Sequence, residues 1–182
     1  MAYALAAEAA ALGAKVSLIS GPVNLNTPEK VTRVDVITAN EMLAACLAAI
    51  ADADVFIGVA AVADYRPQQI ANDKIKKDAD QIQLTLVKNP DIIREIAKLA
   101  SRPLVVGFAA ETSNIVANGE KKLANKGLDL LFANDASETF NSDTIAVTAI
   151  SATASVELAP GNKHVVARNM LQLISDQLPS SD

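Results

Sequence analysis

Short apolar segments alternate with longer helical segments along most of this sequence, and this alternation restricts the fold more than any other feature. The runs at residues 15–20, 54–61 and 103–109 are dominated by Val, Ile, Leu, Phe and small residues. Unbroken apolar runs of this length are typical of parallel strands covered on both faces, and 54–61 is expected at the centre of a sheet. Strands that alternate with helices form doubly wound sheets. The sequence therefore predicts an α/β protein with a doubly wound, mostly parallel sheet and helices on both faces.

Capping signals mark where several of the expected helices begin and end. Thr38 is followed three residues later by Glu41, which is the spacing of a capping box. Asn89 is expected to cap a helix that begins at Pro90, because proline is favoured at the first helical position. Gly127 is placed to end another helix. The remaining expected elements are helices at 2–12, 39–50, 112–126 and 164–178, strands at 32–37, 82–87 and 128–133, and a hairpin at 145–150 and 155–158.

The composition limits the classes of function. The chain of 182 residues is 51% hydrophobic, enough for one core, and its net charge of -5 disfavours general binding to nucleic acid. A single Cys and a single His exclude a disulfide scaffold and a metal site built from clustered Cys or His. No apolar run reaches the roughly 18 residues of a membrane span, and no basic signal segment opens the chain. We therefore expect a cytoplasmic protein that binds neither nucleic acid nor membrane.

The first expected element is a helix, whereas a doubly wound, Rossmann-like nucleotide-binding fold normally begins with a strand and a glycine-rich turn. No strand precedes the helix at 2–12 in this sequence. We therefore expect a single, N-terminally truncated domain over residues 1–178, followed by a short tail at 179–182.

Small and polar residues follow the expected strands at the edge where open α/β sheets bind ligands. The segments 20–24, 58–65, 107–112 and 133–135 each bring a glycine, amide, hydroxyl or carboxylate to that edge. Each segment alone is explained equally well by close packing. Four of them at one edge favour a binding site.

Lysines form a second feature of this acidic chain. The run KIKK, from Lys74 to Lys77, lies in the longest irregular segment, residues 64–81, and long loops in compact domains are often functional lids. Its ammonium groups would offset phosphate charge, although a solvated loop also explains a lysine run. Lys122 and Lys126 share one face of an expected helix and are also compatible with an ordinary surface.

Other reactive side chains are expected to be structural. Cys46 lies among alanines and leucines, where it behaves as a small buried apolar residue. His164 stands near the start of the closing helix, where a surface or capping role is expected. The sequence contains no GxGxxG, Walker A or zinc-ligand pattern.

Seven short stretches of this sequence occur together, in the same order, in one known family. They are GAKVSLISGPV at 13–23, TANEM at 38–42, AAVADYRP at 60–67, KIKK at 74–77, KNPDI at 88–92, VGFAAET at 106–112 and LFAND at 131–135. Through them the chain resembles the bacterial phosphopantothenate–cysteine ligase family (phosphopantothenoylcysteine synthetase), usually the C-terminal half of a bifunctional coenzyme A biosynthesis protein. The resemblance covers nearly the whole chain.

The resemblance implies a two-step ligation. CTP would activate the carboxylate of 4'-phosphopantothenate as an acyl-cytidylate with release of pyrophosphate, and the amine of L-cysteine would then displace CMP. Lys74 matches the family's catalytic lysine, and Ala61 matches a backbone position that lines the acyl pocket. The positions that match nucleotide contacts are Gly58, Val59, Ala60, Asp64, Lys74, Pro90, Asp91, Ile92, Ile93, Phe108, Lys122 and Lys126.

The resemblance also implies partners and one departure. Mg²⁺ is expected on the triphosphate, held through phosphates without a dedicated set of protein ligands. A homodimer is expected, as is an upstream flavin-dependent phosphopantothenoylcysteine decarboxylase domain in the full-length protein. Family members carry a strand, a glycine-rich turn and a catalytic Asn before the first helix, and that Asn has no counterpart in this sequence.

Two alternatives remain open at this point. An inactive nucleotide-binding or dimer-forming fragment of the same family is compatible with the expected truncation. A dinucleotide-binding oxidoreductase is compatible with the fold class. In this sequence, however, SGPVN and ITAN stand where GxGxxG and an acidic residue are required.

Overall fold

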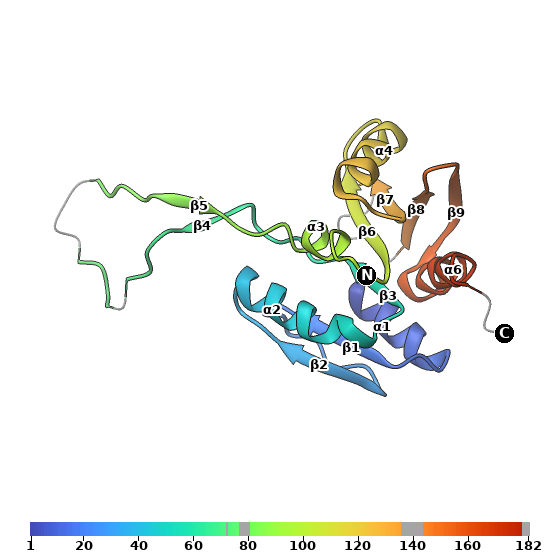
Figure 1. Cartoon of the computed structure of the whole chain (residues 1–182), viewed down its shortest axis with the longest axis horizontal. Helices are drawn as coiled ribbons and strands as arrows, with labels where there is room; N and C mark the ends of the chain where they lie inside the picture. The colour runs from blue at the N-terminus through green and yellow to red at the C-terminus, as the bar shows by residue number, and fades with distance from the viewer. Residues whose placement is uncertain (72, 77–80, 136–143, 180–182) are drawn as a thin grey trace.

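A five-stranded mixed sheet forms the centre of the computed structural model, which describes residues 1–71, 73–76, 81–135 and 144–179 (Figure 1). Its strands are β3 (Val55–Gly58), β6 (Leu104–Glu111), β7 (Leu130–Asp135), β8 (Thr144–Ile150) and β9 (Ser155–Asn162). They follow one another in that order across the sheet. The first three run parallel to one another, β8 runs antiparallel to β7, and β9 runs antiparallel to β8. The α/β class and the C-terminal hairpin are confirmed.

Helices cover both faces of this sheet. They are α1 (Ala2–Ala11), α2 (Ala39–Ala49) with the 3-10 turn η1 (Ile50–Asp52), α3 (Ile92–Ala97), α4 (Ile115–Lys126) and α6 (Lys163–Ser175). Val106 of β6 enters a core with α1 and α6, whereas its neighbour Val105 enters a second core with α2, α3 and α4. A strand buried on both faces needs apolar residues at every position, which explains the unbroken apolar run in the sequence.

A separate parallel pair of strands lies beside this sheet, formed by β1 (Val16–Ser20) and β2 (Val31–Asp35). Among the described residues, β1 pairs only with β2, and β3 pairs only with β6. The doubly wound arrangement is confirmed, but the expectation that the 54–61 strand is central is wrong. β3 is an edge strand, and its residues are only half-buried because no neighbouring strand covers its second edge in the described part of the chain.

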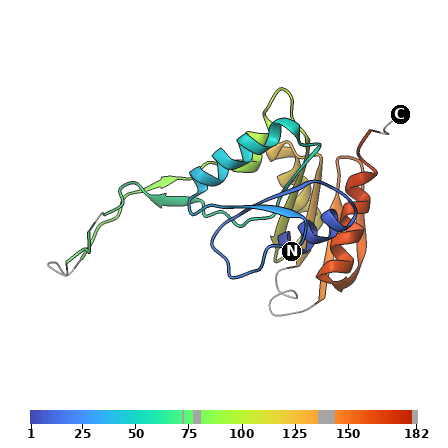
Figure 2. The same cartoon turned by 90° about the horizontal axis from the view of Figure 1, so that it is seen from below.

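A two-stranded ribbon projects from the body (Figures 1 and 2). We call residues 64–89 the arm, and it contains β4 (Tyr65–Pro67) paired antiparallel with β5 (Leu86–Lys88). The sequence predicted an irregular segment followed by an edge strand at 82–87. The strand exists but is shorter, and its partner is β4, which the sequence did not reveal because three residues are too few to show an alternating pattern.

Helix ends follow the capping signals at some sites and depart from them at another. The Thr38 hydroxyl accepts a hydrogen bond from the Glu41 N–H at 3.1 Å, and the Glu41 carboxylate accepts from the Thr38 N–H at 3.2 Å. This capping box confirms the predicted start of α2. Gly127 has φ 68 and ends α4, as predicted. The helix predicted to follow Asn89 is capped by Asp91 instead, so Asn89 and the proline after it precede the helix.

Candidate active site

Two glycines lie side by side where β3 ends. Gly58 of β3 and Gly107 of β6 are register partners. A Cβ atom on Gly58 would lie 2.9 Å from Cδ1 of Ile93, and one on Gly107 would lie 2.7 Å from Cδ1 of Leu128. Glycine at these positions therefore lets α3 and the segment that follows α4 approach the sheet closely. The predicted positions Gly58 and Ile93 meet at the carboxyl edge of the parallel strands.

Residues 59–61 continue the chain along this edge. Val59 is half-buried and packs toward the core that contains α1 and α6. Ala60 and Ala61 are exposed. Small exposed residues leave their peptide groups accessible, and backbone groups at this edge are what ligands contact in open α/β sheets. The structure thus places all three predicted positions on the edge.

Asn89 joins the base of the arm to the same edge. Its backbone N–H donates to the Asp64 carbonyl at 2.8 Å, and its side-chain amide donates to the Ala63 carbonyl at 2.8 Å. Arg66 donates to the Asn89 side-chain oxygen at 3.1 Å. These bonds fix Asp64, whose side chain is exposed, beside the segment that begins at Pro90. Two more predicted positions, distant in sequence, therefore come together.

Lys122 and Lys126 extend from consecutive turns of α4, and each ends at a carboxylate. Lys126 Nζ lies 3.1 Å from Oδ2 of Asp91, the N-cap of α3. Lys122 Nζ lies 2.5 Å from Oε1 of Glu111, the last residue of β6. Sequence reasoning selected both lysines and Asp91 but assigned no role to Glu111. The available signal was its position at the end of a buried strand, within the segment 107–112 that the sequence placed at the ligand-binding edge.

The remaining predicted nucleotide positions contribute mainly to packing. Phe108 is half-buried against the core with α1 and α6, on the opposite face of the sheet from α4. Ile92 is buried in the second core, with α2, α3 and α4, and Ile93 packs against this core. Any contact of Ile92 with a ligand would therefore be made through its backbone.

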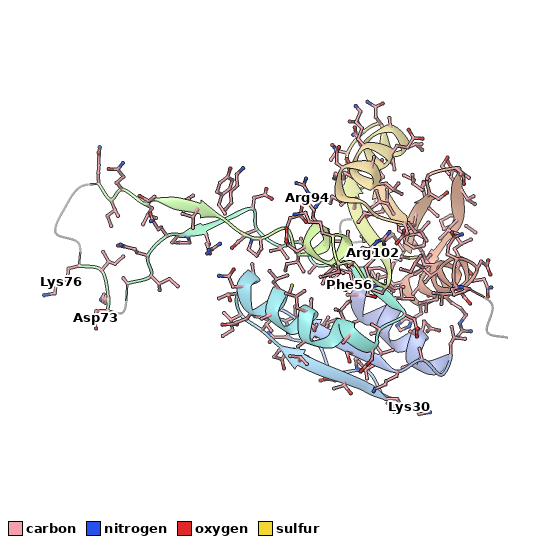
Figure 3. All side chains as sticks on the ribbon, in the orientation of Figure 1. Lys30, Phe56, Asp73, Lys76, Arg94 and Arg102 are labelled. Atoms are coloured by element: carbon pink, nitrogen blue, oxygen red, sulfur yellow. The ribbon has the colours of Figure 1, made fainter. Side chains whose placement is uncertain are left out.

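The structure does not bring Lys74 to this edge. Asp73 and Lys76, its neighbours in sequence, lie at the far end of the arm (Figure 3). Lys77 lies outside the described residues. Large apolar side chains are exposed along the arm, namely Tyr65, Ile70, Ile75, Ile82, Leu84 and Leu86.

Cys46 and His164, the two reactive side chains that the sequence analysis set aside, occupy the places expected of structural residues. Cys46 is buried in α2, and burial raises the pKa of its thiol to about 11, so it is a core residue. His164 is exposed, and its Nδ1 lies 3.0 Å from the Glu8 carboxylate in α1. Both expectations are confirmed. Within the described ranges, no group of three or more His, Cys, Asp or Glu side chains is arranged to hold a metal ion.

An open groove of about 540 Å³ lies at the opposite, amino edge of the strands. Arg102 and Asp129 form a two-pronged ion pair there, and the Asp129 carboxylate also accepts a hydrogen bond from the Val105 N–H at 2.7 Å. Arg102 first, and then that N–H, hold the pKa of Asp129 below its usual value. The charged pair of the groove therefore ties β6 to the start of β7, and the carboxyl edge remains the better candidate site.

Known proteins resemble this chain in sequence and in fold. A family model described as the DNA/pantothenate metabolism flavoprotein C-terminal domain matches residues 1–178. The coenzyme A biosynthesis bifunctional protein CoaBC of Vibrio parahaemolyticus is 47% identical over 178 residues, which cover 94% of this chain and 45% of that protein. The CoaBC protein of Escherichia coli is 51% identical over 154 residues, which cover 81% of this chain and 38% of that protein. The chain thus spans less than half the length of these curated relatives.

Solved structures show the same fold. The crystal structure of the C-terminal domain of a CoaBC protein has a TM-score of 0.80 at 35% identity and covers 96% of this chain and 80% of that chain. A DNA/pantothenate metabolism flavoprotein from Streptococcus pneumoniae has a TM-score of 0.80 at 18% identity, with 96% of this chain and 86% of that chain covered, and supports the fold alone. The resemblance carried by the seven stretches is confirmed, and the chain belongs to the family of DNA/pantothenate metabolism flavoprotein C-terminal domains.

Proposed function

We propose that this chain is a phosphopantothenate–cysteine ligase of coenzyme A biosynthesis that uses CTP. The observation that supports it is the carboxyl edge, which carries the exposed residues Ala60 and Ala61, the exposed carboxylate of Asp64, and the ammonium groups of Lys122 at the end of β6 and Lys126 at the start of α3. Relatives named as coenzyme A biosynthesis proteins support the same assignment.

The proposed chemistry requires positive charge at this edge. A carboxylate oxygen of 4'-phosphopantothenate attacks the α-phosphorus of CTP, and the bond to pyrophosphate breaks. The cysteine amine then attacks the acyl carbon and loses a proton, and CMP leaves as the amide forms. Both partners of the first step are anions, so ammonium groups placed beside the reacting phosphate lower the barrier. Lys122 and Lys126 are at the edge to do this, and Lys74 is the further cation that we assign to catalysis.

Magnesium would accompany the triphosphate in this reaction. Mg²⁺ usually binds through substrate phosphates and one or two carboxylates. A site without a three-carboxylate cluster among the described residues fits that mode of binding.

We also propose that the chain forms a homodimer through its arm. Ile82 and Leu84 of the arm have exposed fractions of 62% and 64%. A two-stranded ribbon is marginally stable in water, so a second copy that covers these side chains would stabilise it. The same contact would allow the end of an arm, with Lys74, to approach a carboxyl edge. The double variant Ile82→Asp, Leu84→Asp should elute as a monomer with light-scattering detection, whereas Val156→Asp, at an exposed site on β9, should not change the mass.

The reaction itself is tested by product formation. Purified protein is mixed with 4'-phosphopantothenate, L-cysteine, Mg²⁺ and either CTP or ATP at equal concentration. Pyrophosphate is measured over time, and the amide is identified by mass spectrometry. We expect faster release with CTP. Equal or faster release with ATP would contradict the choice of nucleotide, and release without amide would contradict the ligation.

One structural observation favours a second candidate, an inactive nucleotide-binding or dimer-forming fragment of the family. β1 and β3 each lack a partner on one edge among the described residues. Calorimetric binding of Mg·CTP without any release of pyrophosphate would favour this candidate over the ligase.

The relatives named as bifunctional suggest the context of this domain. We propose that the full-length protein also carries a flavin-dependent phosphopantothenoylcysteine decarboxylase domain and acts in the cytoplasm. Among the described residues, no helix is long and apolar enough to cross a bilayer.

A further inference from the structure

Glu111 is a buried carboxylate at the site, and the ligase proposal gives it no part. It ends β6 on the face that α4 covers, and its side chain is only 10% exposed. A buried carboxylate is costly unless a cation or hydrogen-bond donors compensate it. Glu111 has both, because Oε1 lies 2.5 Å from Lys122 Nζ and Oε2 accepts a hydrogen bond from the Asn118 side-chain amide at 3.4 Å.

Asn118 fastens this carboxylate to the start of α4. The same amide also donates to the Ser113 carbonyl at 2.9 Å, so the end of β6, the connecting turn and the first turns of α4 are linked. Asn114, the N-cap of α4, has φ 47 and makes no capping side-chain hydrogen bond in the described structure. The contacts of Glu111 and Asn118 therefore help to hold this helix end in place.

The Lys122 ammonium is held but not enclosed. Its side chain is 45% exposed. The ammonium group of Lys122 has three N–H donors. One of them donates to Glu111, and the others remain for a ligand. The neighbouring pair of Lys126 and Asp91 is looser, at 3.1 Å with side chains 38% and 40% exposed, and exposed pairs of this kind restrain little. Its buried partner, the Glu111 carboxylate, therefore distinguishes Lys122 from Lys126.

We propose that Glu111 is a positioning residue that fixes the Lys122 ammonium at the carboxyl edge, where it meets a phosphate of the nucleotide. The inference rests on the proposed function, since that function supplies the nucleotide. A side chain ordered before the ligand arrives loses less freedom on binding, which increases affinity. If Glu111 instead occupied Lys122 and kept phosphate away from it, removal of the Glu111 charge would increase the affinity for the nucleotide.

Four variants separate these roles in calorimetric titrations with Mg·CTP. Glu111→Gln keeps the shape of the side chain and removes its charge, and we expect a Kd about tenfold higher, equivalent to about 1.4 kcal/mol. Glu111→Asp keeps the charge and should recover part of this loss. Lys122→Gln should weaken binding at least as much as Glu111→Gln, and the double variant should match Lys122→Gln within about twofold, because Glu111 acts through Lys122.

The matched control is Glu95→Gln, which removes an exposed carboxylate paired with Lys98 at 2.8 Å on α3. We expect it to leave the Kd unchanged. The unfolding temperature is measured for every variant. If Glu111 is merely structural, its replacement should lower the unfolding temperature equally with and without Lys122 and should leave the Kd of the folded protein unchanged. An unchanged or lower Kd in Glu111→Gln, or losses that add in the double variant, would overturn the proposal.

Lysine acylation gives a readout that does not depend on activity. Bound Mg·CTP should slow the reaction of Lys122 with an N-hydroxysuccinimide ester, mapped by mass spectrometry, and should leave Lys98 unaffected. If the protein binds Mg·CTP but Lys122 is not protected, this inference fails while the proposed function stands. If neither Mg·CTP nor Mg·ATP binds, the proposed function fails, and the inference fails with it.

Discussion

The Cδ1 atom of Ile93 occupies the space that a side chain on Gly58 would need. A Cβ atom built on Gly58 would stand 2.9 Å from it, closer than real Cβ contacts allow. Ile93 lies in the first turn of α3, directly after Pro90 to Ile92. The small residue at the end of β3 therefore determines how closely the start of α3, which carries several proposed nucleotide contacts, approaches the edge of the sheet.

Gly58→Ala should push Ile93 outward. We expect a loss of about 1–3 kcal/mol in the free energy of unfolding, because added atoms in a packed site force neighbours out of their preferred positions. Urea denaturation measures it. Gly21→Ala is the control, since its Cβ would meet only Cε of Met42 at 4.0 Å, and we expect a change within about 0.5 kcal/mol. Equal effects of the two substitutions would show that Ile93 has room to move.

The contact between α1 and α6 should weaken in acid. The Glu8 carboxylate accepts hydrogen bonds from Arg168 at 2.6 and 3.0 Å and lies 3.0 Å from Nδ1 of His164. Arg168 first, and then His164, lower the pKa of Glu8 from its ordinary value of 4.5. A carboxyl group whose pKa is lower in the folded state stabilises the fold above its unfolded pKa, and this contribution is lost as the pH falls through the folded value.

Glu8→Gln tests this expectation. Its destabilising effect should be full near pH 7 and should shrink as the pH falls below about 4.5, where wild-type Glu8 also becomes neutral. The free energy of unfolding is measured in urea at several pH values. In an Arg168→Met background the pH dependence of the Glu8→Gln effect should be smaller. An effect of Glu8→Gln that is independent of pH would mean that the carboxylate charge does not contribute.

Much of the fold could be predicted because its signals are local. The apolar run in β6, the capping box of Thr38 and Glu41, and Gly127 at the end of α4 each depend on a few neighbouring residues. The arm could not be predicted in the same way. β4 and β5 are three residues each and pair across about twenty intervening residues, so neither strand carries a pattern of its own.

Individual residues of the candidate site could be predicted, but the contacts between them could not. The family resemblance selected Lys122, Lys126 and Asp91, yet the pairing of Lys126 with Asp91 joins residues 35 positions apart and depends on how α3 and α4 pack. The partnership of Lys122 with Glu111 depends in the same way on the closeness of α4 to the end of β6. Such pairings arise from tertiary packing, which no local pattern specifies.

Among the described residues, β1 pairs only with β2 and β3 only with β6, so each strand leaves one edge that an added strand could pair with. One variant carries, added at its N-terminus, the segment that precedes the matching helix in the CoaBC protein of Escherichia coli. We expect the added segment to protect the amides of Val55 to Gly58 from hydrogen exchange and to raise the rate of pyrophosphate release sharply. A parallel partner would pair the backbone groups on the second edge of β3, and the segment would supply the glycine-rich turn and the Asn that the resemblance implies. The same segment with its order scrambled is the control. Full ligase activity of the 182-residue chain without the segment would show that it is dispensable.

Lys74→Gln should reduce the chemical step far more than nucleotide binding. The first step brings a carboxylate against phosphate oxygens, and both are negative before they react, so a cation that reaches them lowers the barrier. Gln keeps a similar reach and hydrogen-bonding capacity but lacks the charge. Loss of one well-placed electrostatic contact costs about 10²–10³ in rate, or roughly 3–4 kcal/mol. Lys76, on the same end of the arm, is the matched control, and Lys76→Gln should change the rate by less than about tenfold, near 1.4 kcal/mol. The measurement is single-turnover formation of the acyl-cytidylate, in the protein form that shows ligase activity. Equal rates for the two variants would show that the lysines of the arm act together as a general basic surface and that Lys74 has no individual role.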